Sequence, residues 1–99
     1  MNSTPSPAPG RETIRVIYSG RVQGVGFRFT TREIAAQHPV TGFVRNQPDG
    51  GVELVAQGDP SDVRRFLDSV AERFHWNIRG CEEMAVADET PYTSFEVRR

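Results

Sequence analysis

The stretch from Asp59 to Phe74 constrains the fold more than any other part of the chain. Asp59 is a favoured N-cap residue, Pro60 suits the first helical position, and Asp62 complements the positive end of a helix dipole. The apolar residues that follow have the spacing of one helix face: Val63, Phe66, Leu67, Val70 and Phe74. A helix with a single apolar stripe must bury it against another layer. The rest of the chain therefore has to supply that layer.

Short runs rich in β-branched and aromatic residues predict a sheet as the second layer. Residues 13–19 have the composition and length of a strand. Residues 41–47 and 52–57 flank the sequence Pro-Asp-Gly-Gly, which is typical of a tight turn, so they predict a β-hairpin. Residues 94–99 alternate apolar and polar positions and predict a closing strand. Residues 76–93 contain strand-like pieces whose register the pattern leaves open.

A further helix is expected between the first two strands. Phe27, Ile34 and Ala35 lie on one side of such a helix, and Pro39 ends it because the residue before a proline avoids helical geometry. The order β-α-β-β-α-β predicts an α+β, ferredoxin-like split βαβ sandwich, in which an antiparallel sheet carries two helices on one face. We expect one domain over residues 13–99, and a disordered tail over residues 1–12, which are rich in Ser and Pro.

The sequence GRVQGVGFR, from Gly20 to Arg28, lies between the first strand and the first helix. Glycine is unfavourable inside strands but common where the backbone bends tightly or approaches a ligand closely. The order strand, glycine-rich turn, helix favours an anion cradle, because turn N–H groups and the helix N-terminus both attract negative charge. Arg28 would add a guanidinium to the same anion. A tight turn with a surface arginine has the same local features, so the motif alone leaves both interpretations open.

Composition and spacing argue against several other function classes. All twelve basic residues are arginine, which excludes a P-loop lysine, and the formal net charge of −1 gives no basic field for nucleic acid. Gly24 and Gly26 lack the third glycine of a dinucleotide fingerprint. The segment GVGFRF loosely resembles an RNA-recognition signature, but its aromatic residues precede a helical pattern rather than lying in a strand. RNA binding is therefore a distant alternative.

The residues that ligate metals or form disulfides are few and scattered. His38, His75 and Cys81 lie far apart in the sequence, so we expect no metal site. A single cysteine cannot form an internal disulfide, which fits a reducing compartment. No apolar run approaches the length of a membrane span, and the N-terminus lacks the pattern of a secretory signal. We therefore expect a cytoplasmic protein.

Two motifs in the right order resemble the acylphosphatase family. GRVQGVGFR matches that family's G-x-V-Q-G-V-x-F-R signature without a gap, and GFVRNQPDGGVE (Gly42–Glu53) matches its G-aromatic-V-x-N strand followed by a glycine-containing turn. The resemblance extends over Thr13 to Val97. It implies hydrolysis of the carboxyl–phosphate bond of small acyl phosphates to a carboxylate and inorganic phosphate. It also implies a reaction without metal. We further expect no cofactor, no nucleic-acid or membrane partner, and a monomer.

The resemblance assigns roles to particular positions. Arg28 and Asn46 would be the catalytic residues, with Arg28 on the phosphate and Asn46 orienting the attacking water. The phosphate would be bound by the loop and the start of the helix: Arg21, Val22, Gln23, Gly24, Val25, Gly26, Phe27 and Arg28. A catalytically inactive relative that binds phosphate or a partner is the alternative.

Three further side chains are given structural roles from the residues themselves. Gln23 is expected to shape the loop by hydrogen bonding to the backbone. Arg45 is expected to be solvated, on the face of its strand opposite Asn46. Trp76 is expected to pack beneath the last quarter of the chain.

Overall fold

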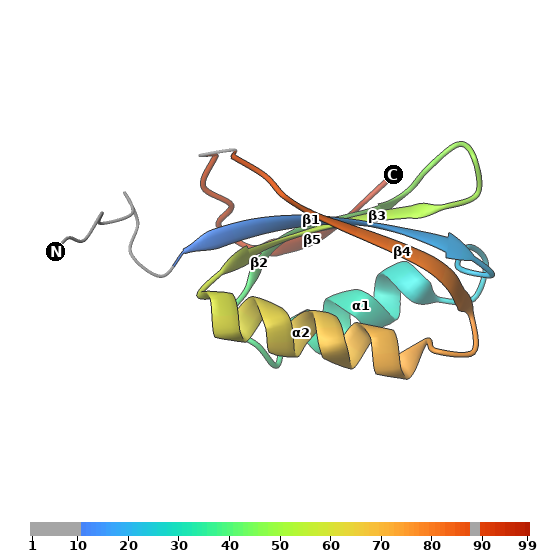
Figure 1. The fold of residues 1–99 in the computed structure, drawn as a ribbon, viewed down its shortest axis with the longest axis horizontal. Helices are drawn as coiled ribbons and strands as arrows, with labels where there is room; N and C mark the ends of the chain where they lie inside the picture. The colour runs from blue at the N-terminus through green and yellow to red at the C-terminus, as the bar shows by residue number, and fades with distance from the viewer. Residues whose placement is uncertain (1–10, 88–89) are drawn as a thin grey trace, which may run out of the picture.

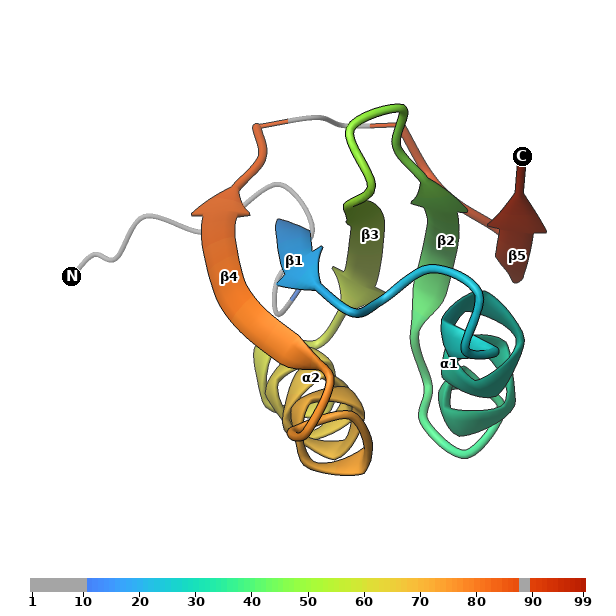
Figure 2. The ribbon, with the colours of Figure 1, turned by 90° about the vertical axis from the view of Figure 1, so that its right-hand side faces the viewer.

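The computed structural model describes residues 11–87 and 90–99, which form two layers (Figure 1). One layer is a sheet, and two helices cover one of its faces (Figure 2). The elements in chain order are β1 (Glu12–Gly20), α1 (Phe27–Ala35), β2 (Thr41–Asn46), β3 (Val52–Gly58), α2 (Pro60–Arg73), β4 (Ile78–Ala85) and β5 (Phe95–Arg98). The predicted ferredoxin-like α+β fold is confirmed. Residues 1–10 of the expected tail lie outside the described residues, and β1 begins at Glu12.

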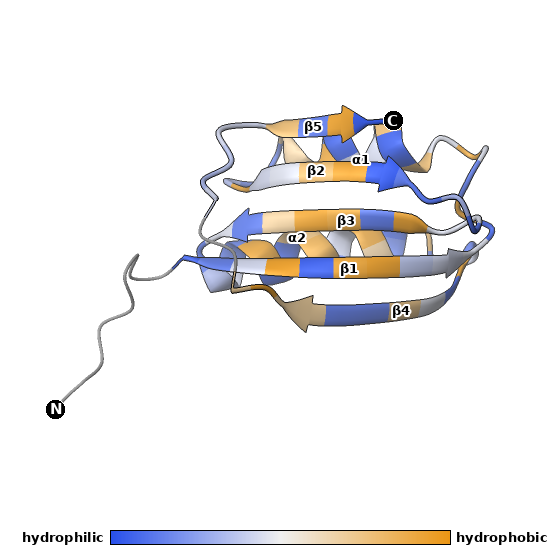
Figure 3. Cartoon of the chain, turned by 90° about the horizontal axis from the view of Figure 1, so that it is seen from above, coloured by the Kyte–Doolittle hydropathy of each residue, from blue (hydrophilic) through white to orange (hydrophobic). Residues whose placement is uncertain are grey.

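The strands are ordered β4-β1-β3-β2-β5 across the sheet (Figure 3). β2 pairs antiparallel with β3, which is the predicted hairpin, and β1 pairs antiparallel with β3 and β4. β5 joins parallel to β2, so the complete sheet is mixed. The strand that closes the β-α-β-β-α-β unit is β4, from the region whose register the sequence left open. The C-terminal strand expected at residues 94–99 is instead an addition at the opposite edge.

The hydrophobic core lies between the sheet and the helices. The predicted stripe of α2 is buried along its whole length, and alternate residues of β1 and β3 face it from the sheet. α2 begins as expected, because the Asp59 carboxylate accepts a hydrogen bond from the Ser61 N–H at 3.0 Å and Pro60 occupies the first turn. No helix among residues 11–87 and 90–99 is long and apolar enough to cross a membrane.

Phe27 fixes the first turn of α1 to the rest of the core. Its ring lies 5.1 Å from that of Tyr18 in β1 and 4.4 Å from that of Phe74 at the end of α2, measured between ring centroids. The prediction that Trp76 packs beneath the last quarter of the chain is wrong, since Trp76 is 88% exposed. Phe74 fills the core at this point, and the tight turn that follows leaves Trp76 outside.

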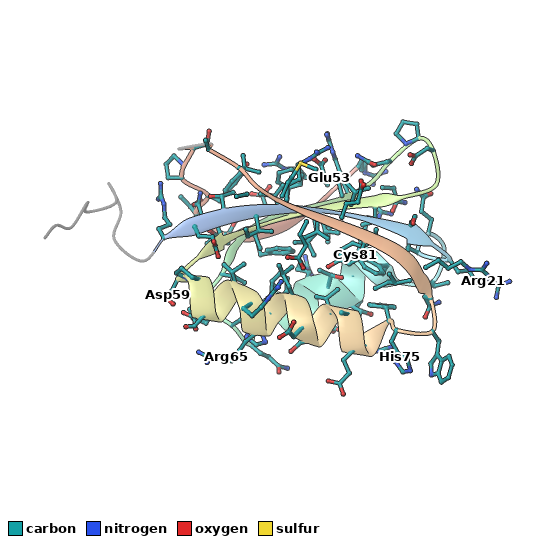
Figure 4. The ribbon with its side chains drawn as sticks, viewed as in Figure 1. Arg21, Glu53, Asp59, Arg65, His75 and Cys81 are labelled. Atoms are coloured by element: carbon teal, nitrogen blue, oxygen red, sulfur yellow. The ribbon has the colours of Figure 1, made fainter. Side chains whose placement is uncertain are left out.

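Glu53 lies on the sheet face away from the helices (Figure 4), and its buried carboxylate is paired with two arginines. Glu53 accepts hydrogen bonds from Arg15 Nε at 2.6 Å and from Arg45 Nε at 2.5 Å. The Glu53 side chain is 6% exposed, whereas those of the two arginines are 35% and 47% exposed. Burial opposes ionisation of Glu53, but the hydrogen bonds and charges of both arginines outweigh it and lower the pKa of this carboxyl. Arg45 is therefore ion-paired as well as partly solvated.

Glu53→Gln is expected to lower the free energy of unfolding by about 2 kcal/mol at neutral pH, because both arginines lose their carboxylate. The folded pKa of Glu53 lies below its unfolded value near 4.5, so the carboxylate stabilises the fold above that pH. This contribution is lost as the pH falls through the folded pKa. Denaturant unfolding of both proteins should therefore show a difference that shrinks in acid. A difference that stays constant into acid would contradict the ion-pair contribution.

Candidate active site

The glycine-rich connection between β1 and α1 and the end of β2 lie at the same end of the sheet. β1, β2 and β5 all run toward this end (Figure 3), and the β1–α1 connection crosses it (Figure 2). Asn46 is the last residue of β2, and Arg28 is the second residue of α1. The two expected catalytic residues, 18 positions apart in the sequence, are therefore brought to one edge of the domain.

Two glycines give the loop its bend. Gly24 and Gly26 have φ angles of 77° and 79°, in the left-handed region that side chains disfavour. In the part of the chain that the structure describes, no carbonyl or side chain accepts a hydrogen bond from the backbone N–H groups of residues 22–27. Loops of this kind can turn successive N–H groups toward one point and form an anion-binding concavity.

The start of α1 adds donors to the loop. Gly26 is the N-cap and supplies no side-chain acceptor, and the first turn holds no acidic residue. The first helical hydrogen bond runs from the Thr30 N–H to the Gly26 carbonyl at 2.9 Å. The N–H groups before Thr30 and the positive end of the helix dipole are thus left for an anion outside the helix.

Side chains and backbone on both sides hold the loop in place. Gln23 Nε2 donates to the backbone carbonyls of Gln47 and Gly51, each at 2.8 Å, which ties the loop to the β2–β3 hairpin. The prediction that Gln23 shapes the loop through the backbone is confirmed. On the other side, the Arg21 N–H donates to the Asn77 carbonyl at 2.8 Å, and Asn77 Nδ2 donates back to the Arg21 carbonyl at 3.2 Å.

An open pocket of about 380 Å³ lies between the loop, α1 and the ends of β2 and β5. Its lining is formed by Val22, Gly24, Gly26, Phe27, Arg28, Phe29, Arg32, Asn46 and Val97. Most of the expected site is therefore brought together on one cavity. Arg21, Gln23 and Val25 do not line it; the Arg21 side chain extends into solvent (Figure 4).

Arg28 and Asn46 present different chemistry to the pocket. Both side chains are half-buried. Arg28 Nη1 donates to the Arg98 carbonyl at 3.1 Å, which steadies the guanidinium and leaves its other N–H groups unpaired among the described residues. The Asn46 amide has no hydrogen-bond partner within residues 11–87 and 90–99. It can therefore both donate to and accept from a small ligand.

Three residues of the lining were not predicted from the sequence. Phe29 and Arg32 lie on the same helix as Arg28, and Arg32 follows it by four positions, a spacing that places both on one helix face. Helical spacing alone could have indicated Arg32. Val97 reaches the pocket only because β5 pairs with β2, which no local pattern shows.

The other chemically active side chains do not join the site. His38, His75 and Cys81 are absent from the pocket lining. The described residues contain no group of three or more His, Cys, Asp or Glu that could hold a metal ion. Cys81 is exposed on β4, where partial burial and the charge of Glu83 raise the pKa of its thiol.

The arrangement suits a small tetrahedral anion. Backbone N–H groups and a planar guanidinium can surround phosphate oxygens, while an uncharged amide stands beside them. No aspartate, glutamate or histidine is found among the residues that line the pocket, so none of these residues is placed as a general base.

Comparison with known proteins agrees with this geometry. The family model named Acylphosphatase matches residues 14–97. An acylphosphatase of Oceanobacillus iheyensis is 39% identical over 88 residues, covering 86% of this chain and 96% of that protein, and one of Gloeobacter violaceus is 45% identical over 87 residues, covering 81% and 86%. The crystal structure of an acylphosphatase from Bacillus subtilis superposes with a TM-score of 0.80 at 26% identity, covering 89% of this chain and 99% of that one. The chain therefore belongs to the acylphosphatase family, and acylphosphatase activity follows from that membership.

Proposed function

We propose that this protein hydrolyses small acyl phosphates with a backbone phosphate cradle, Arg28 and a water oriented by Asn46. The observation that carries the proposal is the shared cavity: free loop N–H groups, a guanidinium and an unpaired amide all border it. The products are a carboxylate and inorganic phosphate. The cytoplasmic location and the monomeric state stay predictions.

A site with few catalytic side chains is sufficient because an acyl phosphate is already activated. Its leaving group is a carboxylate, which needs no proton from a general acid. Phosphoryl transfer is accelerated mainly by positioning and by stabilising charge on the transferring oxygens. The loop N–H groups of residues 22–27 and the Arg28 guanidinium supply that stabilisation.

Asn46 acts on the nucleophile in this scheme. Its amide holds a water in line with the bond that breaks, and the water attacks phosphorus as the carboxylate leaves. An oxygen of the substrate's own phosphate takes the proton from the water. This route fits a pocket lining that holds no carboxylate or imidazole.

The alternative functions differ in what they need from the site. A catalytically inactive relative would bind phosphate in the same cradle without turnover. An RNA-recognition surface needs its aromatic residues on a central strand, whereas Phe27 and Phe29 lie in α1. The two aromatic residues of the GVGFRF segment therefore do not supply such a platform.

The test is the hydrolysis of benzoyl phosphate, followed by its ultraviolet absorbance in the presence of EDTA. We expect turnover that EDTA leaves unchanged and that inorganic phosphate inhibits competitively, because the product occupies the same cradle. Phosphate binding without turnover would favour the inactive relative. Turnover that depends on an added metal would contradict the proposed site.

Gln23→Met is expected to weaken phosphate inhibition by about tenfold, because two hydrogen bonds that hold the cradle are lost while the side-chain volume is kept. The inhibition constant of inorganic phosphate measures this effect, with a melting curve to show that the fold survives. The matched control is Gln37→Met, which changes an exposed glutamine after α1. An unchanged inhibition constant in Gln23→Met would mean that the loop holds its shape without this clamp.

A further inference from the structure

α1 places a second guanidinium on the pocket, one turn beyond Arg28. Arg32 lines the cavity together with Arg28 and Phe29. Side chains four residues apart on a helix lie on one face, with Cβ atoms about 5–6 Å apart. In the proposed hydrolysis the loop, Arg28 and Asn46 have roles, and Arg32 has none.

Arg32 has no acidic partner among the residues that the structure describes. In the part of the chain that the structure describes, no carboxylate lies within ion-pair distance of Arg32, whereas Arg15, Arg45 and Arg64 each have an acidic partner. The Arg32 guanidinium carbon lies 5.7 Å from the centroid of the Phe29 ring. A ring at this distance orients the planar group without cancelling its charge.

The position of Arg32 relative to the cradle decides which part of a substrate it meets. A phosphoryl group bound by the loop and Arg28 occupies the side of the pocket next to the N-terminus of α1. An acyl group that stays in the pocket then extends along the remaining lining, which includes Phe29, 57% exposed, and Val97, 37% exposed. This part of the pocket offers two apolar side chains and one unpaired cation.

We infer that Arg32 is a specificity residue that binds a second anionic group on the acyl part of the substrate. The preferred substrates are acyl phosphates with a short apolar body that ends in a carboxylate or a second phosphate. The inference rests on the proposed function, since it assumes that the cradle holds the transferred phosphoryl group. The contact with Arg32 is the same before and during the reaction, so it lowers KM and leaves kcat nearly unchanged.

The experiment compares 3-carboxybenzoyl phosphate with 3-methylbenzoyl phosphate. The two substituents are similar in size and differ in charge, and the rigid ring keeps the carboxylate from attacking its own acyl carbon. We expect the wild type to favour the carboxylate substrate by about five- to tenfold in kcat/KM, the range of an exposed to half-buried charge pair. Added salt should reduce the preference.

Variants at Arg32 separate a specific contact from general attraction. Arg32→Gln should abolish the preference, while kcat for the methyl substrate changes little. The matched control is Arg65→Gln, which removes the same charge from the solvent side of α2 (Figure 4) and should keep the wild-type preference. A preference that survives in Arg32→Gln, or that is absent from the wild type, overturns the inference.

A binding measurement keeps this test independent of catalysis. The probes are 3-carboxybenzylphosphonate and 3-methylbenzylphosphonate, which contain no hydrolysable bond, and calorimetry gives their dissociation constants. We expect the wild type to prefer the carboxylate probe and Arg32→Gln to lose the preference. If this holds while no acyl phosphate is hydrolysed, the proposed function fails and the Arg32 subsite stands. If both benzoyl phosphates are hydrolysed equally well and both phosphonates bind equally, the subsite fails and the function stands.

Discussion

Arg28→Lys is expected to lower kcat/KM for benzoyl phosphate nearly as far as Arg28→Ala, both by roughly 10³-fold. A lysine keeps the positive charge but is a point donor, and it lacks the planar fork that binds two phosphate oxygens at once. Lysine also lacks a separate nitrogen for the Arg98 carbonyl, which accepts a hydrogen bond from Arg28 Nη1 at 3.1 Å. The lysine charge would therefore lie on a side chain that nothing steadies.

The measurement is kcat/KM for the two variants and the wild type, with a melting curve for each protein. Arg65→Lys is the matched control, because it makes the same substitution on the solvent side of α2, away from the pocket. A rate near that of the wild type in Arg28→Lys would mean that Arg28 contributes only a diffuse field, and the bidentate role would be wrong.

Asn46→Ala is expected to separate binding from chemistry. If the amide holds the attacking water, its loss removes an interaction that is used mainly in the transition state. We therefore expect kcat to fall by at least roughly 10²-fold, as for other single positioning or oxyanion donors, with little change in the inhibition constant of phosphate. The fold should survive, because the Asn46 amide makes no hydrogen bond to the described residues.

The control for Asn46→Ala is Gln47→Ala, which removes an amide from the next position. The backbone carbonyl of Gln47 remains, so the hydrogen bond from Gln23 is kept. An unchanged kcat in Asn46→Ala would remove this residue from the mechanism. A collapse of phosphate affinity that matches the loss of kcat would make Asn46 a binding residue instead.

Local signals explain which parts of the fold were predictable. α2 has a capping carboxylate, a proline in its first turn and a full apolar stripe. The hairpin between β2 and β3 has the turn sequence Pro-Asp-Gly-Gly. Both elements could therefore be predicted from short stretches of sequence. β4 has no such signal, since most of its residues are exposed and its place depends on pairing with β1. The parallel pairing of β5 with β2 depends on equally distant contacts. Trp76 was misplaced because hydrophobicity alone cannot show that the turn after Phe74 leaves the indole outside the core.

The same contrast between local signals and distant contacts applies to the candidate site. Gly24, Gly26 and Arg28 lie within one motif, so the tight bend at the two glycines and the position of Arg28 at the helix start could be predicted from it. The sequence predicted that Gln23 bonds to the backbone. Only the fold shows that its partners are the carbonyls of Gln47 and Gly51. Val97 was missed because it lines the pocket from a strand 70 residues after Phe27 in the sequence.

A second cluster of arginines offers a competing place for an anion. Arg45 and Arg99 border an open hollow beside the β2–β3 turn, together with Asn46, Gln47 and Pro48. Arg45 is already paired with Glu53, which reduces its attraction for a further anion. The cradle instead offers N–H groups that no described residue accepts from. Phosphate should therefore bind at the loop rather than at this hollow.

The most direct measurement of this difference is the titration of the ¹⁵N-labelled protein with inorganic phosphate, followed by the backbone amide signals. We expect the largest shift changes to fall on residues 22–28 and to saturate with the same constant as phosphate inhibition. Shift changes centred on Arg45, Gln47 and Arg99, with the loop amides unmoved, would contradict phosphate binding in the cradle.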